Sequence, residues 1–143
     1  MLSLTCKAAI KAVLYLASHV AGTQRFGMVE VAAAIDENEH TVGKLLQKLV
    51  KANIIHSAKG PNGGFYITDA QLSQPIIRIV HAIDGEELFT SCGLGLSHCS
   101  HQHPCPIHND YKKVRDGFEQ LCRQKTIADL CKPVTEGAAF LVN

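Results

Sequence analysis

A glycine-rich segment between two short apolar runs is the feature that most constrains how this chain folds. The first run covers residues 54–58, the second covers residues 65–68, and the segment between them reads Lys59-Gly60-Pro61-Asn62-Gly63-Gly64. Glycine allows positive φ and a close approach of the backbone to other molecules, and proline presets φ for a turn. The pattern therefore predicts a small β-hairpin with a tight tip.

The residues before this hairpin have the apolar periodicity of helices. We expect helices over residues 4–20, 28–35 and 40–53, with Asn38 as the N-cap of the third. Two short helices, the second of them basic, followed by a glycine-rich hairpin, are the order of a winged helix-turn-helix domain. The polar face of the third helix carries Thr41, Lys44, Gln47, Lys48 and Lys51.

The distribution of charge supports a nucleic-acid partner for this helix and hairpin. The chain has a net charge of only +1, yet residues 40–68 contain lysines and no Asp or Glu. A locally basic face is typical of a compact DNA reader, although a solvated helix face has the same composition. The helix would enter the major groove, and the hairpin tip would reach an adjacent groove or the phosphates. The candidate DNA-binding residues are His40, Thr41, Lys44, Lys48, Lys59, Gly60, Pro61, Asn62 and Gly63.

The second half of the chain is predicted to be helical around an irregular segment. Pro75 suits the first position of a helix over residues 75–83, and residues 86–104 lack periodicity. A long helix is expected from Pro106 and a short last helix from Thr126. A heptad-like seam on the long helix favours a homodimer, with packing against its own domain as the alternative. The seam consists of Ile107, Tyr111, Val114, Phe118 and Leu121.

Together these elements predict a mainly α fold with a small β-hairpin, in which a winged helix-turn-helix is followed by a long dimerisation helix. We expect one compact domain divided into a DNA-binding part at 1–85, a Cys/His cluster-binding loop at 86–108, and the dimerisation helix with the C-terminal tail at 109–143. No apolar run approaches the roughly 18 residues that a membrane helix needs, so no membrane partner is expected. The N-terminal residues lack the pattern of a secretory signal, which favours a cytoplasmic protein with reduced thiols.

Cysteine and histidine gather in the irregular segment. Residues 92–108 hold three of the six Cys and four of the eight His, in the pattern Cys92-x6-Cys99-x5-Cys105-x2-His108. Three thiolates and an imidazole suit zinc or an iron–sulfur cluster, and they do not suit Mg²⁺ or Ca²⁺. Structural zinc sites usually place two ligands two to four residues apart, so the wider spacing favours a cluster. The remaining histidines of the loop are expected to be solvated, with support of a ligand or replacement of His108 as the alternatives: His98, His101 and His103.

Other functions find less support in the sequence. No Ser/His/Asp or Cys/His catalytic arrangement is recognisable, so we do not expect an enzyme. A small iron–sulfur or thiol redox carrier is an alternative, but such a carrier needs neither the basic helix nor the hairpin. The cysteines outside the loop lie in predicted helices and are expected to be small buried apolar residues: Cys6, Cys122 and Cys131.

With these motifs in place, the sequence resembles the IscR/NsrR-type family of bacterial iron–sulfur transcription regulators from Leu2 to about Leu130. Its opening, Leu2-Ser-Leu-Thr-x-Lys7, leads into a helix that ends in Tyr15-Leu-Ala. The helix motif Leu45-Leu-x-Lys-Leu49 comes before the glycine-rich hairpin. The three-cysteine loop is followed, after the long helix, by Thr126-Ile-Ala-Asp-Leu130.

The resemblance implies a homodimeric winged-helix repressor that binds a palindromic double-stranded DNA operator. It implies that Cys92, Cys99, Cys105 and His108 hold an iron–sulfur cluster, usually 2Fe–2S with 4Fe–4S as the alternative. The state of that cluster would report redox state, nitric oxide or iron–sulfur status.

The chain departs from the family at one point. The family's common form has one residue fewer between the first two cysteines than the six found here. The nitric-oxide-sensing branch sometimes takes its fourth ligand from the partner's first helix, where this chain has Cys6. Regulators on the same scaffold that use zinc, bare thiols or a metabolite are the remaining alternatives.

Overall fold

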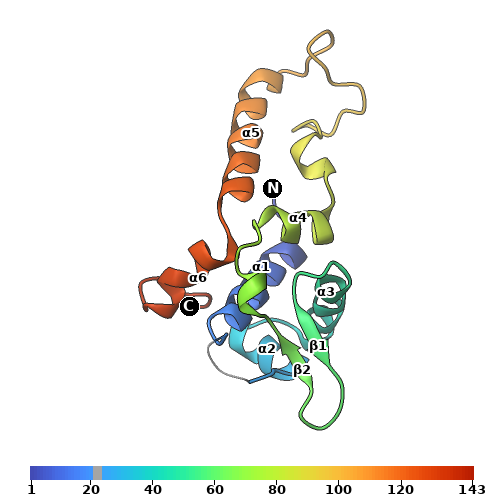
Figure 1. The fold of residues 1–143 in the computed structure, drawn as a ribbon. Helices are drawn as coiled ribbons and strands as arrows, with labels where there is room; N and C mark the ends of the chain where they lie inside the picture. The colour runs from blue at the N-terminus through green and yellow to red at the C-terminus, as the bar shows by residue number, and fades with distance from the viewer. Residues whose placement is uncertain (21–23) are drawn as a thin grey trace.

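The computed structural model describes residues 1–20 and 24–143. It is mainly helical with one two-stranded antiparallel hairpin, as the sequence predicted (Figure 1). Two short 3-10 turns precede and follow α4, at Asp69–Gln71 and Glu87–Phe89. The helices and strands are α1 (Leu4–Ala17), α2 (Met28–Ile35), α3 (Glu39–Lys51), β1 (His56–Ala58), β2 (Gly64–Tyr66), α4 (Ile77–Asp84), α5 (His108–Gln124) and α6 (Ile127–Thr135).

Helix α1 forms the centre of the core. Its alanines Ala8, Ala9 and Ala12 are at most 1% exposed, and their small side chains allow neighbouring helices to come close. Helices α2, α3, α4 and α6 all pack against it. The predicted continuation to residue 20 is wrong, because the Ser18 hydroxyl donates a hydrogen bond to the Tyr15 carbonyl and the chain turns there.

Helices α2 and α3 form the expected helix-turn-helix. Asp36 adopts the left-handed conformation at φ 54° between them, and Asn38 caps α3 as predicted. The Asn38 carbonyl oxygen Oδ1 accepts from the backbone N–H groups of His40 at 2.9 Å and Thr41 at 3.2 Å. The apolar face of α3 is fully buried in the core and its polar face is left on the surface: the buried residues are Val42, Leu45, Leu46 and Leu49.

The hairpin pairs Ser57 with Phe65 in antiparallel register, and Phe26 adds a short bridge to the outer side of Phe65. Its strands are shorter than the predicted runs. The chain leaves α3 through Asn53 at φ 59°, and the Ile54 N–H bonds to the last turn of that helix instead of to a strand. A side chain at Gly63 would lie 2.3 Å from the Ala58 carbonyl oxygen, so this tip requires glycine.

Helix α5 extends away from the helical core and carries the Cys/His loop at its far end (Figure 1). The helix begins at His108, two residues later than the expected Pro106. The base of α5 is tied to the segment before α4, because the Ile76 N–H donates to the Lys125 carbonyl at 2.9 Å. Pro75 is part of this bridge, paired with Thr126, so it does not open α4 as predicted. No helix in the described part of the chain is both long and apolar enough to cross a membrane.

We expect Asn38→Ala to lower the free energy of unfolding by about 1 kcal/mol, because two backbone N–H groups at the start of α3 lose their acceptor. Denaturant unfolding followed by circular dichroism measures this change. Asn38→Ser is the matched control and should restore most of the stability, since serine also caps helices. An alanine variant as stable as the wild type would contradict this role of Asn38.

Candidate metal centre and nucleic-acid interface

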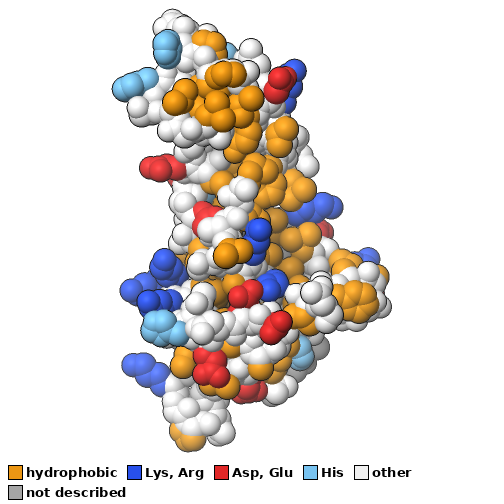
Figure 2. Space-filling model, turned by 180° about the vertical axis from the view of Figure 1, so that it is seen from behind, with side chains coloured by type: hydrophobic (Ala, Val, Ile, Leu, Met, Phe, Trp, Pro, Cys, Tyr) orange, Lys and Arg blue, Asp and Glu red, His pale blue; other side chains and the backbone are white. Residues whose placement is uncertain are grey.

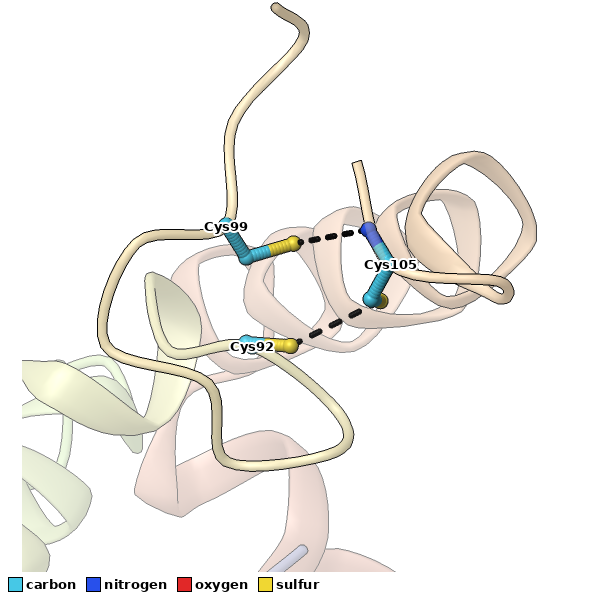
Figure 3. Close-up of side chains that lie close together, drawn as sticks. All are labelled: Cys92, Cys99 and Cys105. Carbon is cyan, nitrogen blue, oxygen red and sulfur yellow. Dashed lines mark hydrogen bonds between the residues drawn. The ribbon is translucent and has the colours of Figure 1, made fainter. Parts of the chain in front are cut away.

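Three cysteines that are far apart in the loop converge at the N-terminal end of α5. The Sγ atoms of Cys92, Cys99 and Cys105 all lie within 4.8 Å of one another. Figure 3 shows these side chains pointing toward one another from three separate stretches of the loop. The Cys92 and Cys105 sulfurs are in contact at 3.6 Å.

Cys99 is held differently from the other two thiols. Its Sγ accepts a hydrogen bond from the Cys105 backbone N–H at 3.4 Å and lies 3.0 Å from Nδ1 of His108. His108 is the first residue of α5, so the helix itself positions its ring. The second ring nitrogen of His108, Nε2, is buried without a hydrogen-bond partner, and the ring packs edge-on against His101 at 5.1 Å. The imidazole therefore faces the thiols through Nδ1.

The first part of the loop is docked on α5. Gly93 lies flat on the Tyr111 ring, where an added Cβ would be 2.7 Å from the ring carbon Cγ. One α5 turn further on, Arg115 donates from Nη1 to the Ser91 carbonyl at 2.6 Å. Both contacts flank Cys92 and hold its part of the loop against α5.

The backbone around Cys92 favours its thiolate form. N–H groups of Leu94 and Leu96 point at its sulfur and lower the pKa of Cys92 to about 7, and the Leu94 N–H lies 3.4 Å from Sγ. Cys105 is 7% exposed, and this burial raises the pKa of its thiol. A metal bound here would remove both protons, because thiolates and not thiols are the ligands.

The donor set fits a soft metal group. Three thiols and one imidazole nitrogen are the ligands that zinc and iron–sulfur clusters use. Thiolates on one tetrahedral ion with metal–sulfur bonds of about 2.3 Å lie roughly 3.7–3.8 Å apart. The Cys92–Cys105 distance of 3.6 Å matches that spacing. Iron–sulfur clusters are held by the same kind of thiolate ligands, so the convergence of the three cysteines suits either group.

The remaining Cys and His residues stay outside this group. The loop histidines His98, His101 and His103 are exposed, as expected. Cys6 is fully buried, and this burial, with Asp84 beside it, raises its pKa to about 12. The other two cysteines are also buried, at 1% exposure for Cys122 and 7% for Cys131. The prediction that these three are small buried residues is confirmed.

The predicted DNA-binding helix residues lie on one exposed face. His40, Lys44 and Lys48 line a shallow hollow of about 570 Å³ over α3. Figure 2 shows Lys and Arg side chains gathered on the edge of the molecule where α3 lies. Thr41 is half-buried beside this face. The hollow is completed by residues that the sequence reasoning did not select as contacts: Met28, Gly43, Gln47, Lys51 and Phe65.

The hairpin tip projects beyond the body of the molecule (Figure 1). Lys59, Gly60, Pro61 and Asn62 are exposed at this tip, whereas Gly63 is half-buried against the backbone of β1. A tip of this shape can present backbone and lysine charge to a phosphate chain.

Some of the supporting residues could have been found in the sequence and others could not. Helical spacing had already placed Gln47 and Lys51 on the polar face of this helix, although they were not chosen as DNA contacts. Nothing in the sequence links Gly93 to Tyr111 or Ser91 to Arg115, because each pair is separated by a loop whose path is set by tertiary contacts.

The curated relatives of the chain are named as HTH-type transcriptional regulators. A protein named as an HTH-type transcriptional regulator from Aquifex aeolicus is 26% identical over 129 residues, which cover 88% of each chain. A second, from Neisseria meningitidis serogroup A, is 27% identical over 114 residues, covering 78% of this chain and 76% of the relative.

Solved structures share the fold, among them IscR and CymR. IscR of T. potens has a TM-score of 0.72 at 19% identity and covers 97% of this chain and 91% of its own. CymR, the global cysteine regulator of B. subtilis, has a TM-score of 0.74 at 16% identity and covers 92% of this chain and 96% of its own. At this level of identity the likeness establishes the winged-helix fold.

The family model gives the assignment. The model of the Rrf2 family, described as an iron-dependent transcriptional regulator, matches residues 2–133. The members and the curated relatives are transcriptional regulators and not enzymes, in agreement with the expectation from the sequence. The chain therefore belongs to the Rrf2 family of transcriptional regulators.

Proposed function

We propose that this protein is a homodimeric cytoplasmic repressor whose affinity for a palindromic operator depends on an iron–sulfur cluster. Cys92, Cys99, Cys105 and His108 would hold the cluster, with 2Fe–2S favoured over 4Fe–4S. The observation that carries the proposal is the convergence of three thiols within 4.8 Å at the first turn of α5, with His108 beside Cys99. A protein that only binds DNA has no need for such a set of ligands.

The DNA contacts follow from the exposed face of α3. Lys44 and Lys48 would donate to guanine acceptors or to phosphates in the major groove, with His40 and Thr41 near the start of the helix. The tip at 59–63 would contact the backbone or the adjacent minor groove. A two-fold dimer presents two such faces, and its operator would be palindromic with half-sites one helical turn or more apart.

The dimer is proposed from the outer face of α5. Val114 is 60% exposed, Leu121 is 47% exposed and Ile107 is 38% exposed, at the heptad-like spacing seen in the sequence. Figure 2 shows apolar side chains along the extended half of the molecule. A second copy of the chain would bury these three residues, whereas Tyr111 and Phe118 of the same seam pack within the chain. Residues 109–143 would then be the dimerisation part, 1–85 the DNA-binding part and 86–108 the loop that responds to the signal.

Coupling between the two sites follows from the attachment of the loop. When bound, the cluster would supply a redox-active and nitric-oxide-reactive group that ties the loop to the first turn of α5. Gly93 and Ser91 dock the same loop on Tyr111 and Arg115. A change in the loop would therefore shift α5, and in a dimer this alters the spacing of the two α3 helices.

A zinc-dependent regulator on the same scaffold is the second candidate. It is favoured by one observation, the 3.6 Å separation of the Cys92 and Cys105 sulfurs, which suits a single tetrahedral ion. Iron, sulfide and zinc analysis of anaerobically purified protein distinguishes the two candidates.

Cys99→Ala should abolish the colour of anaerobically purified protein, because Cys99 is the thiol that pairs with His108. The visible spectrum and the iron and sulfide content measure the loss. Cys131→Ala is the control, since this buried cysteine lies on α6, away from the loop. If the Cys99 variant is as brown as the wild type, Cys99 is not a ligand. If the wild type carries zinc and no sulfide, the zinc candidate is correct.

Lys44→Ala should weaken operator binding and reduce the salt dependence of binding by about one phosphate contact, because Lys44 is exposed on the hollow over α3. Fluorescence anisotropy at several salt concentrations measures both quantities. Lys132→Ala on α6 is the charge-matched control and should leave them unchanged. An unchanged affinity and salt slope in the Lys44 variant would exclude this contact.

Gly93→Ala should loosen metal binding by roughly ten- to a hundredfold, the usual effect of disturbing residues that support a ligand. The added methyl group collides with the Tyr111 ring and pushes the Cys92 backbone away from α5. The rate of iron transfer to a chelator measures the effect, and Ser97→Ala at an exposed position of the same loop is the control. Equal transfer rates for wild type and Gly93→Ala would show that docking on α5 does not support the site.

A further inference from the structure

We propose that the metal-free loop is also a disulfide site, in which Cys92 and Cys105 are oxidised to one intrachain bond and Cys99 keeps its thiol. The proposal concerns the same cysteines as the proposed cluster, but it requires no metal. The two sulfurs lie 3.6 Å apart and need only close to about 2.05 Å to bond.

The structure selects this pair among the three loop cysteines. In the described loop, the Cys92 and Cys105 sulfurs are in contact with each other. The Cys99 sulfur instead accepts from the Cys105 N–H at 3.4 Å and lies 3.0 Å from His108 Nδ1. The chain beyond Cys92 can also adjust, because Gly95 sits in open space at φ +77°. A small closure of the loop would therefore form the bond without disturbing the His108 side of the site.

The different exposure of Cys92 and Cys105 indicates which thiol is oxidised first. Cys92 is half-buried and its sulfur receives the Leu94 N–H at 3.4 Å, while Cys105 is only 7% exposed. A small oxidant such as hydrogen peroxide would therefore meet Cys92 first, and Cys105 would act as the resolving thiol.

The two steps balance with one peroxide. The Cys92 sulfur attacks one peroxide oxygen, the O–O bond breaks, and the other oxygen leaves as water together with the Cys92 proton. The Cys105 sulfur then attacks the sulfenic sulfur of Cys92, the S–O bond breaks, and a second water carries away the Cys105 proton. Two thiols have lost two electrons to one hydrogen peroxide, which has become two waters.

The other cysteines do not compete for the oxidant. Cys6 is fully buried and Cys122 is 1% exposed, both in the helical core, and Cys131 is 7% exposed on α6. The expected change is therefore the loss of two thiols from the six in the chain.

The experiment uses the full chain, freed of metal by a chelator under reducing, anaerobic conditions and then treated with one equivalent of hydrogen peroxide. Free thiols are counted after unfolding, and intact mass is measured without reductant. We expect four of the six thiols to remain and the mass of the monomer to fall by two hydrogens. Cys99→Ser is the matched control, and it should lose two thiols at the wild-type rate.

Cys92→Ser should lose thiols roughly ten times more slowly than the wild type, because the thiol that meets the peroxide is absent. Cys105→Ser should not lose two hydrogens in mass, because oxidised Cys92 then has no resolving thiol in contact. The proposal is overturned by a wild type that keeps all its thiols, by a Cys99→Ser variant that does not react, or by a Cys92→Ser variant that reacts as fast as the wild type. The cluster is tested separately by colour and by iron and sulfide content. A coloured protein that forms no disulfide, or a colourless one that does, therefore identifies which proposal fails.

Discussion

The burial of α1 is the constraint on which the rest of the molecule depends. Ala8, Ala9 and Ala12 leave its surface so narrow that α2, α3, α4 and α6 can all pack directly against it. The same helix therefore fixes the orientation of α3, whose polar face meets DNA in the proposed function, and of α4, which leads to the Cys/His loop. A large side chain at any of these alanines would push the packed helices α2, α3, α4 and α6 away from α1.

Helix α5 connects the loop to this core, because one end of the helix is bonded to the core and the other end contacts the loop. At its base, the Ile76 N–H donates to the Lys125 carbonyl and the Ile127 N–H donates to the Gln74 carbonyl, each at 2.9 Å. At its far end, His108 faces the thiols and Tyr111 supports the loop. A helix fixed in this way transmits displacement as a rigid element, which is the physical basis of the coupling proposed between the loop and the DNA-reading face. In the proposed dimer, a second copy of the chain would lie along its exposed seam.

Local chemistry explains the parts of the structure that were predictable. Asn38 caps α3 because its side chain can accept from two free backbone N–H groups, and Gly63 lies at the hairpin tip because no other residue fits against the Ala58 carbonyl. Apolar spacing likewise predicted which face of α3 is buried. Helix ends were less predictable: α1 stops at Ala17 through a side-chain hydrogen bond from Ser18, and Pro75 pairs with Thr126, a residue far along the chain.

The sequence by itself determined the winged helix-turn-helix order, the basic face of α3 and the identity of the candidate soft ligands in the loop. These features depend on residue type and on short spacing along the chain, so apolar periodicity and coordination chemistry are sufficient to predict them. Only the tertiary structure decided which thiols touch, that Cys92 meets Cys105 while Cys99 meets His108, and that Gly93 rests on Tyr111. The loop has no regular hydrogen-bond pattern of its own, so its path is set by where α5 and the core hold its two ends.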